Sequence, residues 1–175
     1  MIDTNRIEID NLENLETLVS DYIKKNFLPP LAFLGLMGVI GIGTFNRGNV
    51  DAVNFSEHFA QNKDESFSEM LLRLITESGE KNSTIYNRAN IDRRHFSKIV
   101  NHEDYQPSKQ TVLAFAIALK LGFEKTKALL AAAGFTLSNA NLADVIVSAF
   151  IENQIFDVIL VNQILYKYKQ PLLGG

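Results

Sequence analysis

The fold is decided by the stretch ANIDRRHFSKIVNHEDYQPSKQTVLAFAIALKLG, which covers residues 89–122. Asp92 stands directly before a segment with helical spacing, where its carboxylate can accept the free backbone N–H groups of a first turn. Ser108, a good N-cap that follows a proline, marks the start of a second helix. The stretch therefore predicts helices over 93–100 and 108–120. The second is nearly all apolar after its first turn and is expected to be central and buried.

Helical spacing of apolar residues continues on both sides of this stretch. Upstream, Gly79 is a natural stop for a helix that begins near Ser66, and downstream Gly134 ends another. The other predicted helices cover residues 11–27, 66–79, 83–89, 124–133, 139–152 and 156–168. No alternating strand pattern competes, except that 31–45 could be one or two buried strands. The chain is therefore predicted to be mainly α.

The pattern divides the chain into three parts. Residues 1–65 hold an N-terminal helix, an apolar glycine-rich segment and a linker. Residues 66–137 hold five helices, and residues 138–175 add a C-terminal extension with two more. The apolar faces of this extension could complete the core of the monomer, which we favour, or form a two-fold interface.

Residues 27–45 form a 19-residue run that is mostly apolar, close to the length of about 20 that crosses a bilayer core. Lys24 and Lys25 precede it and Arg47 follows it. Two prolines and four glycines oppose a membrane span, as does the positive-inside rule, which would place the central helices outside the cell. We favour a buried packing segment. A single-pass membrane segment and an apolar element that docks on a partner stay open.

The composition of the 175-residue chain excludes several kinds of site. The absence of cysteine rules out a disulfide scaffold, a thiolate zinc site and a cysteine nucleophile. Of its three histidines, His58 and His102 have no partner at metal-ligand spacing. The carboxylates form no convincing acid–base pair, and so few histidines support no catalytic triad. We therefore predict no metal site, no cofactor and no enzymatic activity.

The segment GIGTFNRGNV, residues 41–50, superficially resembles the glycine-rich loop of protein kinases. Nothing downstream supplies the lysine and the two aspartates that a kinase needs at usable spacing. A P-loop is absent too, because no Gly-Lys-Ser/Thr follows the glycines. No nucleotide site is therefore predicted.

The charges are unevenly distributed, although the net charge is only −3. Residues 1–65 carry ten acidic and five basic side chains, whereas residues 81–127 carry nine basic and four acidic ones. A basic segment flanked by acidic or neutral ones is what a local phosphate-binding face needs. A solvated surface with uneven charge is the alternative.

Residues 89–122 resemble the Cro/CI-type helix-turn-helix family, which is also called XRE-like. The resemblance extends over about 66–137 and implies a five-helix domain whose second and third helices form the DNA-reading unit. It places Ile91 at the apolar turn position and Asp92 at the cap of the recognition helix. The other matching positions are Phe96, Ser97, Lys98, Ile99, Pro107, Ser108, Thr111, Val112 and Leu113.

The resemblance also implies which residues contact DNA. Two arginines open the recognition helix, and arginine can bond guanine bidentately in a major groove. Residues at helix starts could hold phosphates through side chains and backbone N–H groups. Phe96, Ile99 and Val100 are expected to face the core. The predicted DNA-binding residues are Arg93, Arg94, His95, Ser97 and Lys98 on the recognition helix, with Lys81, Asn82, Ser83 and Lys109 at helix starts.

Three features depart from the family pattern. Tyr86 occupies a position where most members have a small residue, and it could push the two helices apart or cap a different partner surface. Asn90 replaces the glycine of the turn, and asparagine tolerates the left-handed conformation better than other non-glycine residues. Glu103 and Asp104 put two negative charges just past the recognition helix.

The stretch from Ser66 to Gly174 is also similar to a C-terminal helical module of some bacterial macrodomain proteins. This resemblance implies an accessory module with a regulatory or interaction role, and fold kinship alone does not establish DNA reading. No macrodomain fits into the 65 residues ahead of it.

The sequence thus favours a bacterial cytoplasmic transcriptional regulator that binds duplex DNA as a dimer. The alternative is an interaction module that has lost DNA reading and binds a protein partner through residues 1–65, as in a phage-defence or stress operon. A third hypothesis is a membrane-tethered version anchored through residues 27–45.

Overall fold

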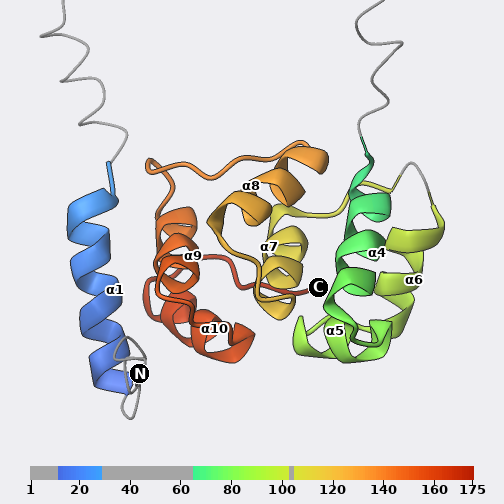
Figure 1. Cartoon of the computed structure of the whole chain (residues 1–175). Helices are drawn as coiled ribbons and strands as arrows, with labels where there is room; N and C mark the ends of the chain where they lie inside the picture. Colours follow the sequence, from blue (N-terminus) through green and yellow to red (C-terminus); the bar gives the residue numbers. More distant parts are fainter. Residues whose placement is uncertain (1–11, 29–64, 103–104) are drawn as a thin grey trace, which may run out of the picture.

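The computed structural model describes residues 12–28, 65–102 and 105–175, and within these ranges the chain is mainly α, with eight helices and no strand. The predictions for 31–45 and 41–50, and the charges of Glu103 and Asp104, lie outside the described residues. The helices are α1 (Leu12–Asn26), α4 (Phe67–Ser78), α5 (Asn82–Arg88), α6 (Arg93–Asn101), α7 (Lys109–Ala118), α8 (Phe123–Ala132), α9 (Leu142–Glu152) and α10 (Val158–Lys167) (Figure 1).

The central helix is α7, as the apolar sequence of this segment predicts. Every residue from Thr111 to Ala118 is buried, which is the behaviour of a helix that is apolar on all sides. Figure 1 shows α4, α5 and α6 on one side of α7 and α9 and α10 on the other. The side chains of α7 therefore form the middle of one continuous core.

The two C-terminal helices complete the core of the monomer, which is the interpretation that the sequence favoured. In α9 every residue from Asp144 to Ile151 is buried. One face of α10 is also buried, through Val158, Val161, Ile164 and Leu165. These faces of both helices are therefore used within the chain, whereas Ile159 and Tyr166 of α10 stay exposed.

The first helix, α1, packs along α9 at the outer edge of the molecule (Figure 1). Leu15 and Val19 are its buried residues, and Glu16 forms an ion pair with Lys167 of α10. Burial and a hydrogen bond with Glu152 raise the pKa of the Tyr22 hydroxyl. Although the sequence groups α1 with residues 1–65, this helix covers the C-terminal extension.

Helix ends account for several of the boundaries. Ser66 and Glu69 form a reciprocal capping box at the start of α4, and Gly79 ends that helix with φ +70°. Asn90, between α5 and α6, has φ +55°. This is the left-handed conformation that the sequence predicts for an asparagine at the glycine position of the turn.

None of the helices in the described ranges combines the length and apolar character that a bilayer-crossing helix requires.

Candidate nucleic-acid interface

The start of α6 is fixed by Asp92, which has an extended backbone conformation. Its Oδ1 accepts the backbone N–H groups of Arg94 at 2.7 Å and of His95 at 2.9 Å. These hydrogen bonds hold the pKa of the Asp92 carboxyl below its ordinary value. The hydrogen bond from the backbone of His95 has the largest effect. A single side chain thus sets the residue at which the predicted recognition helix begins.

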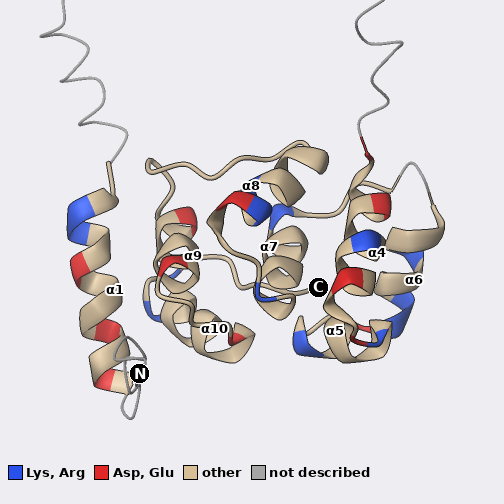
Figure 2. Ribbon diagram, viewed as in Figure 1, with Lys and Arg blue, Asp and Glu red and all other residues tan. Residues whose placement is uncertain are grey.

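The two faces of α6 differ sharply in burial. Phe96 and Ile99 are buried in the core, and Val100 is partly buried. The residues of the opposite face are exposed, namely Arg93, Arg94, Ser97 and Lys98. Figure 2 shows the Lys and Arg positions in blue along the ribbon of this helix. The packing of the apolar face therefore directs the basic residues of α6 into solvent.

The cations of α6 also differ from most other cations in their pairing. Within the described ranges, Arg93, Arg94 and Lys98 form no salt bridge, nor does Lys81 at the start of α5. Their charge is therefore not neutralised by a carboxylate of the described ranges within salt-bridge distance. Phosphate groups can bind such exposed charges without first displacing a carboxylate partner.

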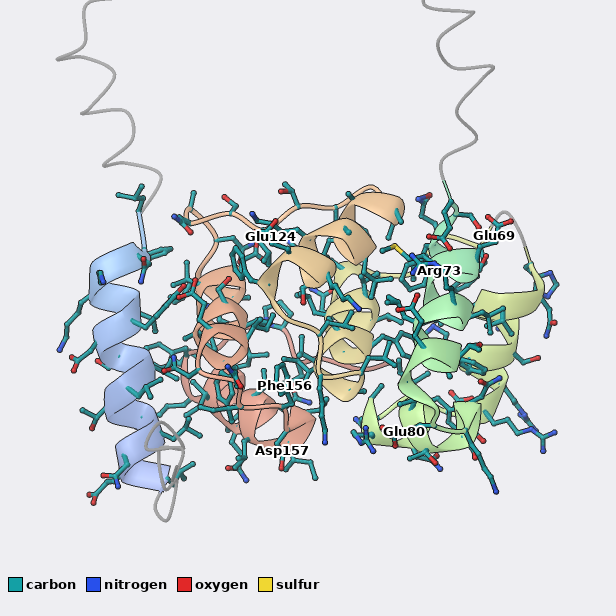
Figure 3. All side chains as sticks on the ribbon, in the orientation of Figure 1. Glu69, Arg73, Glu80, Glu124, Phe156 and Asp157 are labelled. Carbon is teal, nitrogen blue, oxygen red and sulfur yellow. The ribbon has the colours of Figure 1, made fainter. Side chains whose placement is uncertain are left out.

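Two other arginines of the same part of the chain are paired. Arg73 of α4 bonds Glu65 and Glu77. Arg88 of α5 bonds Glu80 through two nitrogens at 2.6 and 2.8 Å and also donates to a backbone carbonyl of α7. This guanidinium lowers the pKa of the Glu80 carboxyl. Figure 3 shows Arg73 on α4 and Glu80 near α5. Both arginines act within the fold, and the sequence analysis did not identify these pairs.

Lys109 lies at the start of α7, as expected, and its side chain is directed to a carboxylate of α9. Its ammonium lies 2.6 Å from Oδ2 of Asp144, whose side chain is only 3% exposed. The same carboxylate oxygen accepts the backbone N–H of Ser138 at 2.9 Å. Lys109 thus connects α7 to α9 and has a carboxylate partner already. At the same helix start, the Ser108 hydroxyl accepts the backbone N–H of Thr111.

His95 and Ser97 have hydrogen-bonding partners within the chain. His95 Nε2 lies 2.9 Å from the Tyr105 hydroxyl, and the two rings meet edge to face. The Ser97 hydroxyl accepts the side-chain amide of Asn101 at 2.9 Å. His95 is half-buried, whereas Ser97 stays exposed. The orientation of both side chains on α6 is therefore defined before any ligand binds.

The start of α5 carries three of the predicted phosphate contacts. Lys81 is the N-cap residue and makes no side-chain capping hydrogen bond, and Asn82 and Ser83 follow in the first turn. All three are exposed. They are therefore accessible to a ligand.

Tyr86 points toward the core side of the α5–α6 pair. Its ring centroid lies 5.3 Å from that of Phe96, which in turn lies 6.1 Å from that of Phe115 in α7. Tyr86 is only partly buried. Its ring therefore fills the space between the two helices.

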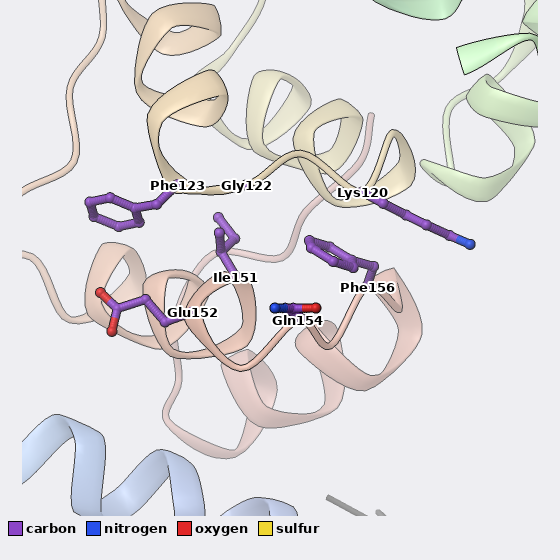
Figure 4. Close-up of a pocket in the computed structure, with 7 residues that line it drawn as sticks. All are labelled: Lys120, Gly122, Phe123, Ile151, Glu152, Gln154 and Phe156. Atoms are coloured by element: carbon purple, nitrogen blue, oxygen red, sulfur yellow. The ribbon is translucent and has the colours of Figure 1, made fainter. Parts of the chain in front are cut away.

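Other kinds of site have little support in the described residues. A hollow between α8 and the α9–α10 turn is lined by Phe123, Ile151 and Phe156, and the charged groups of Lys120 and Glu152 point away from its centre (Figure 4). No group of three His, Asp or Glu residues in the described ranges could hold a metal ion. The exposed face of α6 is therefore the best-defined candidate site.

The Asp92 cap gives a prediction about pH. Because the folded-state pKa of Asp92 lies below its unfolded value, its contribution to stability is fully present above about pH 4 and is lost as the pH falls through the lowered pKa. Asp92→Asn keeps the shape and removes the charge, so we expect a lower melting temperature than wild type at pH 7 and an equal one near pH 2. Thermal melts at both pH values measure this, and a difference that persists at low pH would contradict it.

Comparison with known proteins gives no matching family model, no similar curated protein and no similar solved structure.

Proposed function

We propose that the protein is a DNA-binding transcriptional regulator that reads duplex DNA through α6. The observation that carries the proposal is the set of exposed cations on one face of α6, which have no carboxylate partner among the described residues. In this proposal α4 to α8 are the five helices of a Cro/CI-type domain, and α5 and α6 form its helix-turn-helix. The regulator acts in the bacterial cytoplasm as a dimer on paired half-sites.

The residues of the interface have different roles in this proposal. Arg93 and Arg94, at the N-terminal end of α6, contact base edges, where arginine pairs bidentately with guanine. Lys98 and Lys81 contact phosphates, which adds affinity without sequence preference. Asn82, Ser83, Ser97 and His95 complete the surface with polar groups. Lys109 is not part of this set, because its ammonium already pairs with Asp144.

Selection from a random duplex library on the purified full chain, at near-physiological salt, tests the proposal. We expect enrichment of a palindromic site. Removing one base-reading arginine costs about 1–3 kcal/mol, so Arg93→Ala and Arg94→Ala should each weaken binding to that site by about 5- to 150-fold. Fluorescence anisotropy with the enriched duplex and a scrambled duplex measures the change.

Arg73→Ala is the matched control, since it removes the same charge from an arginine of α4 that is already paired with Glu65 and Glu77. It should bind the enriched duplex as the wild type does. Recovery of no sequence, or an equal loss of affinity for both duplexes in all three variants, would contradict base reading by α6.

The second candidate is an interaction module that keeps the fold and does not read DNA. One observation favours it: Gly174 and Gly175 approach Asn90 and His95, at the turn and on the first turn of the reading helix. Part of the surface beside α6 is thus occupied by the chain itself. A protein partner that binds residues 1–65, together with failure of the duplex selection, would be the expected result for this candidate.

A further inference from the structure

The residues that follow α10 also pack against the rest of the molecule. After this helix, residues 170–175 run past α7 toward the α4–α6 side of the molecule (Figure 1). Leu173 in this segment is only 4% exposed. A short segment without helical structure is therefore held in a defined position, where it contacts α10, the first turn of α7 and the start of α6.

The backbone of Leu173 is recognised by one asparagine of α10. The Leu173 N–H donates to Oδ1 of Asn162 at 2.7 Å, and the Asn162 side-chain amide donates to the Leu173 carbonyl at 3.0 Å. Both backbone polar groups of one residue are satisfied by one side chain, much as a neighbouring strand satisfies them in a sheet. This geometry fits a peptide that bends at a residue with an apolar side chain.

The next position accepts only glycine. Gly174 has φ +116°, a conformation that other residues rarely adopt, and a Cβ atom there would lie 2.9 Å from the backbone oxygen of Asn90. Its carbonyl accepts the Thr111 hydroxyl at 3.3 Å. That hydroxyl lies 2.8 Å from the hydroxyl of Ser108, the N-cap residue of α7. Backbone shape and the start of α7 thus both define this position.

The last position is equally restricted by its surroundings. A Cβ atom on Gly175 would lie 2.2 Å from Nδ1 of His95. The other ring nitrogen of His95 is hydrogen-bonded to Tyr105, so rotation of the ring would break that contact. The His95 ring therefore closes this end of the groove against any side chain.

We infer that these residues form a peptide-binding groove for a Leu-Gly-Gly segment that bends at the leucine, and that residues 173–175 fill it within the chain. Asn162 and Thr111 bind the backbone, while Asn90 and His95 exclude side chains after the leucine. The inference does not depend on DNA reading. A Leu-Gly-Gly segment of a second chain therefore competes with residues 173–175 for the groove next to α6.

Binding of a synthetic peptide to the full-length chain tests the groove directly. The double variant Leu173→Asp/Gly174→Val is designed to displace residues 173–175 from the groove. It leaves the four groove residues, Asn90, His95, Thr111 and Asn162, unchanged. We expect this variant to bind a fluorescein-labelled Gln-Pro-Leu-Leu-Gly-Gly peptide saturably. The wild type should bind it at least about tenfold more weakly, because its tethered segment competes at an effective concentration in the millimolar range. Leu172→Asp, at a position that is 49% exposed, is the control and should bind as weakly as the wild type.

Two further results decide the outcome. Adding Asn162→Ala to the double variant, or replacing the first glycine of the peptide with valine, should abolish binding. No binding by the folded double variant up to about 1 mM peptide, or equal binding of the valine peptide, would overturn the inference.

A second measurement does not require the internal segment to be removed. Gly175→Val in the otherwise unchanged chain should shift the imidazole NMR signals of His95 and leave those of His102 in place. Unchanged His95 signals in that variant would show that the segment does not contact the ring, and would overturn the inference as well.

Discussion

Replacing Asp144 with alanine should lower the free energy of unfolding by about 3–5 kcal/mol, the usual cost of removing one partner of a buried ion pair. The side chain of Asp144 is only 3% exposed, and one of its oxygens accepts both the Lys109 ammonium and the Ser138 backbone N–H. Alanine leaves both donors without this acceptor, and the lysine is itself largely buried. Urea unfolding followed by circular dichroism measures the change.

Asp144→Asn is the matched control for this experiment. The amide keeps an oxygen that can accept the Ser138 N–H and removes only the charge, so the loss should be smaller than that caused by alanine. A loss below about 1 kcal/mol for alanine, which is typical of exposed pairs, would show that Lys109 and Asp144 do not form a buried pair. Lys109 would then become available as a phosphate contact.

Phe96→Ala should be about as damaging, since removing a buried phenylalanine side chain costs about 3–5 kcal/mol. The Phe96 ring lies between the rings of Tyr86 and Phe115. It connects the buried face of α6 to the central helix, α7. Its loss leaves a cavity below the helix that carries the exposed arginines. We therefore expect reduced stability together with increased hydrogen exchange of the α6 amides.

Ser97→Ala, on the exposed face of the same helix, is the control for Phe96→Ala. Its effect on the free energy of unfolding should stay within about 0.5 kcal/mol, as for most surface substitutions. If the two variants unfold at the same urea concentration, α6 is not held by its apolar face. The direction of its arginines would then need another explanation.

Much of the fold could be predicted because its signals are local. The helical spacing of apolar residues, the carboxylate of Asp92 and the hydroxyl of Ser108 each act within one or two turns of their own helix. The same applies to the two faces of α6, which follow from the period of a helix once its start is known. The exposure of Arg93 and Arg94 is therefore a local property.

Helix ends were harder to predict where no glycine marks them. Lys120, Gln154 and Lys169 all have left-handed backbone conformations after a helix. Nothing in those residue types indicates a positive φ, because lysine and glutamine rarely adopt one. The packing of the segment that follows requires the turn at these places, and the tertiary contacts offset its local cost.

By itself, the sequence determined the mainly α fold, the start of α6 and the outward direction of its cations, since these depend on neighbours a few residues apart. Only the tertiary structure decided which polar groups are already paired. Lys109 meets Asp144 35 positions away, and Thr111 meets Gly174 63 positions away. Such pairs form where segments that are distant in sequence come together in the fold. The local spacing of residues along the chain does not indicate which segments these are.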